Sequence, residues 1–183
     1  MTNKVELTIR KSKTVKEALN KYFINNTIGD FDKIPTAKKL AYLQKTPDSF
    51  KRTRVINNMQ INYVDNVYAK KCLNFAFNFD WGYTKTGESI REYKNAKNNT
   101  VFEVIVFLDF YANFDGKTIR RSVTSGHTYY ENPATNRGDA YKAAISKGIT
   151  NFAEQFGIGQ DVKTGSKYHP IDDENMIEVD PSK

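Results

Sequence analysis

Histidine and cysteine, the side chains that most often carry out catalysis or bind zinc, are scarce in this sequence. Its 183 residues include two histidines, His127 and His169, and one cysteine, Cys72. A structural zinc site takes four cysteine or histidine ligands, so the composition excludes one. A Ser-His-Asp triad could be assembled from the residue types present, but no serine stands in the glycine-flanked motif of a nucleophile elbow.

Two other patterns, for nucleotides and for metal ions, are also incomplete. The stretch 157–167 is not a P-loop, because Gly159 and Gly165 have the wrong separation and Ser166 stands where lysine is required. Glu103 and Asp109 share one face of an expected strand, where a magnesium-dependent nuclease could use them. A nuclease is the minor alternative, and we expect a protein that is not an enzyme and needs no cofactor.

The residues that do cluster are lysine and arginine. Lys51, Arg52 and Arg54 lie within four residues, shortly after Pro47. Two interpretations are open: a solvated surface loop, or a site for the phosphate groups of a nucleic acid, since phosphate contacts dominate the affinity of such complexes.

The charge of the whole chain favours a polyanionic partner. The net charge is +7 and the pI is about 9.3, although a merely soluble basic protein is the alternative. Residues 171–183 hold five carboxylates and one lysine, so they carry −4 and the rest of the chain carries +11. A basic body with an acidic tail is common in nucleic-acid-binding proteins, whose tails recruit partners or compete with the polyanion.

The best-defined element that could position these cations is a helix from Asp139, its expected N-cap, to Gly157, which ends it in the left-handed conformation beside Ile158. Apolar residues at steps of three and four line one face of it: Tyr141, Ile145, Ile149, Phe152 and Phe156. A second, thin side lets a sheet or helix approach closely and consists of Ala143, Ala144 and Gly148. The outer, polar ridge carries Lys142, Ser146, Lys147 and Thr150.

Before this helix, residues 100–111 alternate as a strand, with one apolar face made of Phe102, Val104, Val106, Leu108 and Phe110. Asp115 and Gly116 suit a type I′ hairpin turn. The return strand places Arg121 with Ile119 and Val123, and places Arg120 on the opposite face with Thr118, Ser122 and Thr124. That polar face and Lys117 suit a row of phosphates, although an exposed strand of any soluble protein has the same pattern.

Earlier elements are expected as helices over 15–24, capped by Thr14, and from Thr36 to before Pro47, then a strand over 59–64. Asp65 caps the main core helix, which runs to about Phe79 and contains Cys72. Trp81 opens a short strand through Thr84, followed by a loop. The aromatic side chains of this region are interpreted as core rather than as a base-stacking platform: Phe75, Phe77, Phe79 and Trp81.

The order of elements predicts an α+β domain, a curved antiparallel sheet with helices packed on it. We expect an N-terminal helical segment over 1–35, a core over 36–160, and an acidic tail over 161–183 without periodicity. A lone cysteine favours a reducing compartment. The absence of a membrane-spanning run and of a signal-peptide pattern favours the cytoplasm.

Gly138-Asp-Ala-Tyr-Lys-Ala-Ala144, followed by a helix of small residues and Phe156-Gly-Ile-Gly159, resembles the closing helix of the Rad-fifty-two-type single-strand annealing proteins, which include phage recombinases of the Sak kind. The resemblance covers roughly residues 40–160. The segment 46–54, a short strand around Ile61 and Tyr63, the core helix, Trp81 and two long strands follow that family's order.

The resemblance implies ATP-independent binding and annealing of single-stranded DNA in homologous recombination, by a ring or helical homo-oligomer. Together with the charge pattern it gives these candidate DNA-binding residues: Lys51, Arg52, Arg54, Lys117, Arg120, Lys142 and Lys147. The family's closing helix usually carries a Lys-Arg pair where this chain has Thr150 and Asn151. The alternative function is a non-catalytic interaction protein that acts through its acidic tail on a partner such as a single-strand-binding or replication protein.

Overall fold

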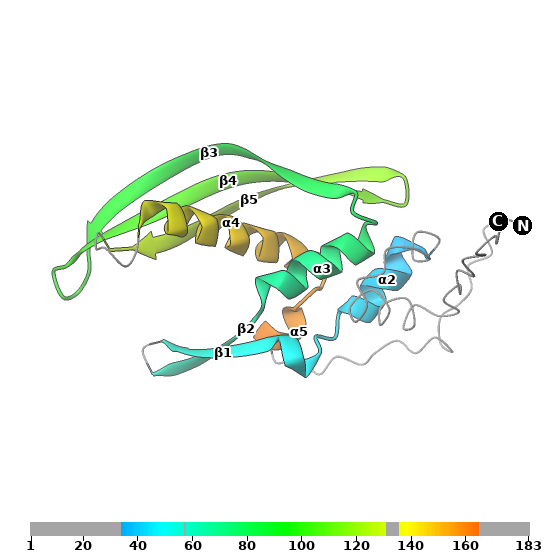
Figure 1. Ribbon diagram of the computed structural model, residues 1–183, viewed down its shortest axis with the longest axis horizontal. Coiled ribbons are helices and arrows are strands. Elements are labelled where there is room, and N and C mark those ends of the chain that lie inside the picture. The colour runs from blue at the N-terminus through cyan, green and yellow to red at the C-terminus, as the bar shows by residue number, and fades with distance from the viewer. Residues whose placement is uncertain (1–33, 57, 131–135, 165–183) are drawn as a thin grey trace, which may run out of the picture.

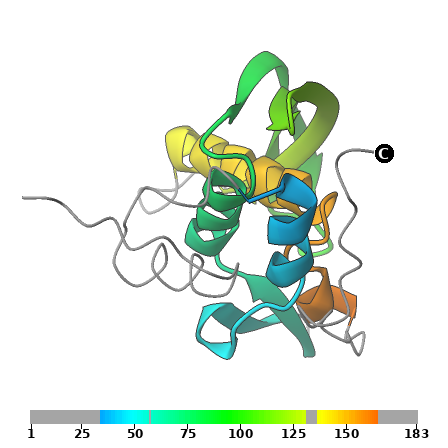
Figure 2. The ribbon, with the colours of Figure 1, turned by 90° about the vertical axis from the view of Figure 1, so that its right-hand side faces the viewer.

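The computed structural model describes residues 34–56, 58–130 and 136–164 and has an α+β architecture with antiparallel sheets, as the sequence predicts (Figure 1). Figure 2 shows three levels: a curved three-stranded sheet, the helices beneath it, and a two-stranded hairpin below the helices. The helix expected over 15–24 and the acidic residues of the tail lie outside the described residues. No described helix is both long enough and apolar enough to cross a membrane.

The three-stranded sheet consists of β3 (Trp81–Lys94), β4 (Thr100–Phe114) and β5 (Lys117–Tyr129), in that order and antiparallel. The predicted alternation of β4 is confirmed, because Val104, Val106, Leu108 and Phe110 are buried while Phe107 and Tyr111 are exposed. The predicted turn is also confirmed. Asp115 and Gly116 both have positive φ angles, 48° and 85°, as a type I′ turn requires.

Strand β3 is ten residues longer than predicted, and the loop expected after Thr84 is the rest of that strand. The strand is an exposed edge with polar residues on both faces, so it lacks the apolar alternation that reveals a strand in the sequence. A bulge between Lys85 and Gly87 shifts the register at its centre. The ring of Phe107 lies over Gly87, and a Cβ atom there would be 3.2 Å from it.

Helix α4 (Arg137–Glu154) lies along the concave side of this sheet (Figure 1). The predicted N-cap is wrong by three residues: Asn136 caps the helix, and its Oδ1 accepts from the N–H of Asp139 at 2.9 Å. Asn136 has the extended backbone that a cap needs, whereas Asp139 is already helical and contributes its charge to the first turn. The helix ends at Glu154, before the predicted Gly157, but the left-handed conformation predicted for Gly157 is confirmed by its φ of 85°, and Ile158 is buried.

The thin side of α4 makes the closest contact with the sheet. Ala144 and Gly148 are buried as predicted, and so is Ala140, whereas Ala143 is only half-buried. The Ser125 hydroxyl of β5 donates to the carbonyl oxygen of Ala144 at 2.7 Å. The apolar face predicted from larger residues is buried only in part: Ile149 and Phe152 are in the core, whereas Tyr141, Ile145 and Phe156 are half-buried.

Helix α3 (Asn66–Ala76) is the predicted core helix, and Asp65 caps it by accepting from the N–H of Val67 at 2.8 Å. It ends three residues earlier than expected. Its buried residues include Tyr68, Cys72, Leu73 and Phe75. Phe75 and Phe77 are core residues, as predicted, but the prediction is wrong for Phe79, which is 43% exposed. Val67 is 58% exposed. Helix α2 (Thr36–Leu43) packs beside α3.

The cationic segment after Pro47 is a strand rather than a loop. A 3₁₀ turn (Asp48–Phe50) leads into β1 (Lys51–Ile56), which pairs with β2 (Met59–Val64) as an antiparallel hairpin. After α4 the chain forms α5 (Gln160–Thr164), although the sequence shows no periodicity there. Val162 is buried, and both carboxylate oxygens of Asp161 accept from Thr46, at 2.7 and 3.0 Å.

Candidate nucleic-acid interface

A groove with a volume of about 690 Å³ lies between the β1–β2 hairpin and α4. Residues of α3, β5 and α5 also contribute to its lining. The lining residues are Arg54, Gln60, Ile61, Asn62, Tyr63, Val64, Asn66, His127, Ala143, Ser146, Lys147, Thr150, Asn151, Val162 and Lys163. In Figures 1 and 2 the β1–β2 hairpin lies below α4.

The groove is positively charged. The Arg54 guanidinium lies 5.4 Å from the centre of the Tyr63 ring, and Lys147 Nζ lies 3.4 Å from the carbonyl oxygen of Gly126. Neither side chain forms an ion pair with any described residue. Lys163 does, with Glu154 at 2.6 Å. No acidic side chain lines the groove in the part of the chain that the structure describes.

The positive charges of the groove affect the pKa of His127, which lines it. Partial burial lowers the pKa of its imidazole, and the charges of Lys147 and Arg54 lower it further. The neutral form is therefore favoured, and a bound anion would oppose that shift. Sequence reasoning missed His127 as a groove residue, because a lone histidine near the end of a strand has no distinguishing spacing.

Of the predicted DNA-binding residues, Arg54 and Lys147 are brought together in the groove from segments about ninety residues apart. Lys51 and Arg52 lie on the same strand but do not line the groove. The Lys51 ammonium pairs with Asp48 at 2.7 Å, and Arg52 donates to the Ser49 carbonyl oxygen at 2.8 Å.

The remaining candidates lie elsewhere. Lys142 is exposed on α4 and is 3.5 Å from Asp139. Lys117 and Arg120 lie at the far end of β5, next to the turn whose Asp115 carboxylate accepts from the N–H of Thr36 at 3.0 Å. Arg120 and His127 are seven positions apart on β5, about 23 Å of strand, so Arg120 does not reach the groove.

The predicted register of β5 is confirmed. Arg121 pairs with Phe110, whose side chain is buried toward the helices, and Arg120 pairs with Tyr111 on the opposite, convex face. Arg120 therefore lies not only at the wrong end of the sheet for the groove but also on its outer side.

Thr150 and Asn151 both line the groove. These are the positions at which the resemblance expects a Lys-Arg pair facing DNA. At these two positions the groove therefore has a hydroxyl and an amide group in place of two cations.

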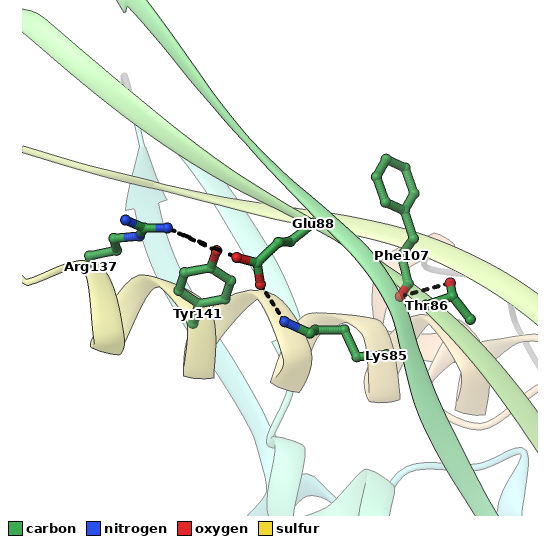
Figure 3. Close-up of polar contacts among 6 residues, drawn as sticks. All are labelled: Lys85, Thr86, Glu88, Phe107, Arg137 and Tyr141. Atoms are coloured by element: carbon green, nitrogen blue, oxygen red, sulfur yellow. Dashed lines mark hydrogen bonds and ion pairs between the residues drawn. The ribbon is translucent and has the colours of Figure 1, made fainter.

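A second polar cluster joins the middle of β3 to the start of α4 (Figure 3). Glu88 forms an ion pair with Lys85 and lies 3.9 Å from Arg137. The Arg137 guanidinium also donates to the Tyr141 hydroxyl at 3.5 Å. The hydrogen bond from Lys85 holds the pKa of the Glu88 carboxyl below its usual range. All four side chains are paired with one another, so this cluster fastens an edge strand to the helix.

The two carboxylates considered for a nuclease do not approach each other. Glu103 and Asp109 are six residues apart on β4, about 20 Å, and Asp109 accepts from the Ser122 hydroxyl at 2.6 Å. Within the described ranges no three His, Cys, Asp or Glu side chains gather as a metal site.

No protein-family model matches the chain, and a comparison with curated proteins found no match either. The function is therefore inferred from the α+β fold and from the positively charged groove.

Proposed function

We propose that the protein binds single-stranded DNA in the groove between β1–β2 and α4 and anneals complementary strands without ATP, as a single-strand annealing protein of the Rad-fifty-two type in phage-type recombination. The observation that supports this most directly is the meeting of Arg54 and Lys147 in one groove that contains no acidic residue among those described. A strand held there by its phosphates keeps its bases free to pair, and annealing then needs no catalytic group.

The groove also predicts how strongly binding responds to salt. Two cations without ion-pair partners would release about two counterions per protomer, giving a slope near −1.4 of log affinity against log salt for a single strand. Affinity per protomer should fall about sevenfold between 50 and 200 mM salt. Loss of one of the two cations should reduce the slope by about 0.7.

Fluorescence anisotropy with a labelled single-stranded oligonucleotide tests this proposal. Arg54→Ala and Lys147→Ala should each weaken binding, and each by the same factor for oligonucleotides of different sequence, because phosphate contacts carry no base information. Lys97→Ala, in the exposed turn between β3 and β4, removes the same charge outside the groove and serves as the matched control. Wild-type affinity and salt slope in both groove variants would exclude this groove as the binding site.

A homo-oligomer is part of the proposal, because a longer strand needs several grooves in a row. Among the described residues, the outer edges of β3 and β5 pair with no further strand, and the convex face exposes Phe107 and Tyr111. Free edges and exposed aromatic rings favour association with other copies. Light scattering and electron microscopy with and without the oligonucleotide measure the oligomeric state, and a monomer under both conditions would contradict the proposed homo-oligomer.

A further inference from the structure

The described chain ends at the groove. Val162 and Lys163 of α5 both line it, and α5 ends at Thr164. Helix α5 is fixed in place, because Val162 is buried and Asp161 accepts two hydrogen bonds from Thr46. Whatever follows Thr164 therefore starts beside the positively charged groove.

The sequence that follows is strongly acidic. Five carboxylates lie between residues 172 and 180: Asp172, Asp173, Glu174, Glu178 and Asp180. The eight residues from Thr164 to Asp172 can span about 27 Å when extended. Neighbouring packed elements are about 10 Å apart, so these carboxylates can reach any part of the groove lining.

We propose that the acidic segment 171–180 of this chain occupies the groove when no nucleic acid is bound, with its carboxylates beside Arg54 and Lys147. These two cations have no ion-pair partner among the described residues, and carboxylates linked to the same chain supply one at high effective concentration. The groove's amide and hydroxyl groups can donate to carboxylates as well as to phosphates. Nucleic acid must then displace the segment, which favours long polyanions over short ones.

The occupancy itself can be tested in the full-length chain without nucleic acid. The test variant replaces the five carboxylates by their amides, as D172N, D173N, E174Q, E178Q and D180N together. Carboxylates in the groove stabilise the charged form of His127, so the NMR titration of His127 should occur at lower pH in this variant than in the wild type. Identical titration of His127 in the two proteins would overturn the proposal. A difference that grows with protein concentration would also overturn it, because the occupant would then belong to another copy.

Binding of the labelled oligonucleotide gives a second readout, which rests on the proposed function. The amide variant should bind about two- to fivefold more tightly at low salt, since a competitor of comparable occupancy has been removed. Adding Arg54→Ala and Lys147→Ala to both proteins separates two causes of tighter binding. If net charge alone is the cause, the difference in affinity should persist, and if competition for the groove is the cause, the difference should disappear. If neither protein binds the oligonucleotide but the His127 shift is present, the proposed function fails and the occupancy of the groove stands.

Discussion

Gly148 offers the most direct test of how α4 packs on the sheet. It is buried against β4 and β5, and a Cβ atom at this position would lie 2.5 Å from Leu108 Cδ1 and 2.9 Å from Ser125 Oγ. Carbon atoms in ordinary contact are about 3.5–4.0 Å apart, so Leu108 would have to retreat by at least about 1 Å. Any side chain at position 148 must therefore displace Leu108 and Ser125, which are both buried.

The expected change in the free energy of unfolding follows from two opposing effects. Overpacking a core contact costs about 1–3 kcal/mol, and replacing a helical glycine by alanine returns about 1 kcal/mol of helix propensity. Gly148→Ala should therefore destabilise the protein by about 0–2 kcal/mol. Gly148→Leu inserts three more carbon atoms and should cost about 3 kcal/mol or more, which lowers the melting temperature by about 6–12 °C in a chain of this size.

Urea unfolding of Gly148→Ala, Leu108→Ala and the variant with both changes isolates the contact between position 148 and Leu108. Leu108→Ala alone should cost about 2–5 kcal/mol, but it also makes room for the new Cβ atom. The double variant should thus be more stable than the sum of the single changes predicts, by about 1 kcal/mol. Lys142→Leu, on the exposed side of the same helix, is the control and should change stability by less than about 0.5 kcal/mol. Additive single effects, or a fully stable Gly148→Leu, would show that this side of α4 does not face the sheet.

Three further outcomes are expected. Arg120→Ala should leave oligonucleotide affinity in anisotropy unchanged, because the residue lies on the convex face far from the groove, while Arg121→Ala should lower the melting temperature more. In the variant whose five tail carboxylates are amides, His127 should titrate by NMR below its ordinary value of about 6.5, and adding Lys147→Ala should raise its pKa by removing a nearby cation. Glu88→Gln should destabilise the protein at pH 7; because the folded-state pKa of Glu88 is lowered, this difference should vanish in urea unfolding once the pH falls through that pKa.

The elements with strong local signals were predictable from the sequence. Strand β4 alternates in apolar character, Asp115-Gly116 suits only a few turn types, and Asp65 stands before an apolar helix, so each local preference agrees with the fold. Strand β3 was mostly missed because its polar residues show no alternation, and only pairing with β4 makes it a strand. The N-cap of α4 was misplaced because Asn136 and Asp139 are both good capping residues. The backbone conformation, extended at Asn136 and helical at Asp139, determines which one caps the helix.

The candidate site was predictable only in part. The cation cluster on β1 and Lys147 on α4 were identified separately, but the sequence does not show that Arg54 rather than Arg52 faces Lys147. Local contacts decide this, since Arg52 hydrogen-bonds the preceding turn. The position of Arg120 outside this groove was unpredictable for a different reason: strand alternation gives the face of a residue but not which end of the sheet lies near the helix and hairpin.

The β1–β2 hairpin projects from the core and is fastened mainly near its base. Val64 is buried there, in contact range of Gly159, whereas Val55 and Met59 toward the other end are 70% and 62% exposed. One wall of the groove can therefore change in length without disturbing the buried residues. Lengthening or shortening each strand by two residues preserves which side chains face which way. Groove depth is thus a property that evolution or design can adjust independently of the stability of the domain.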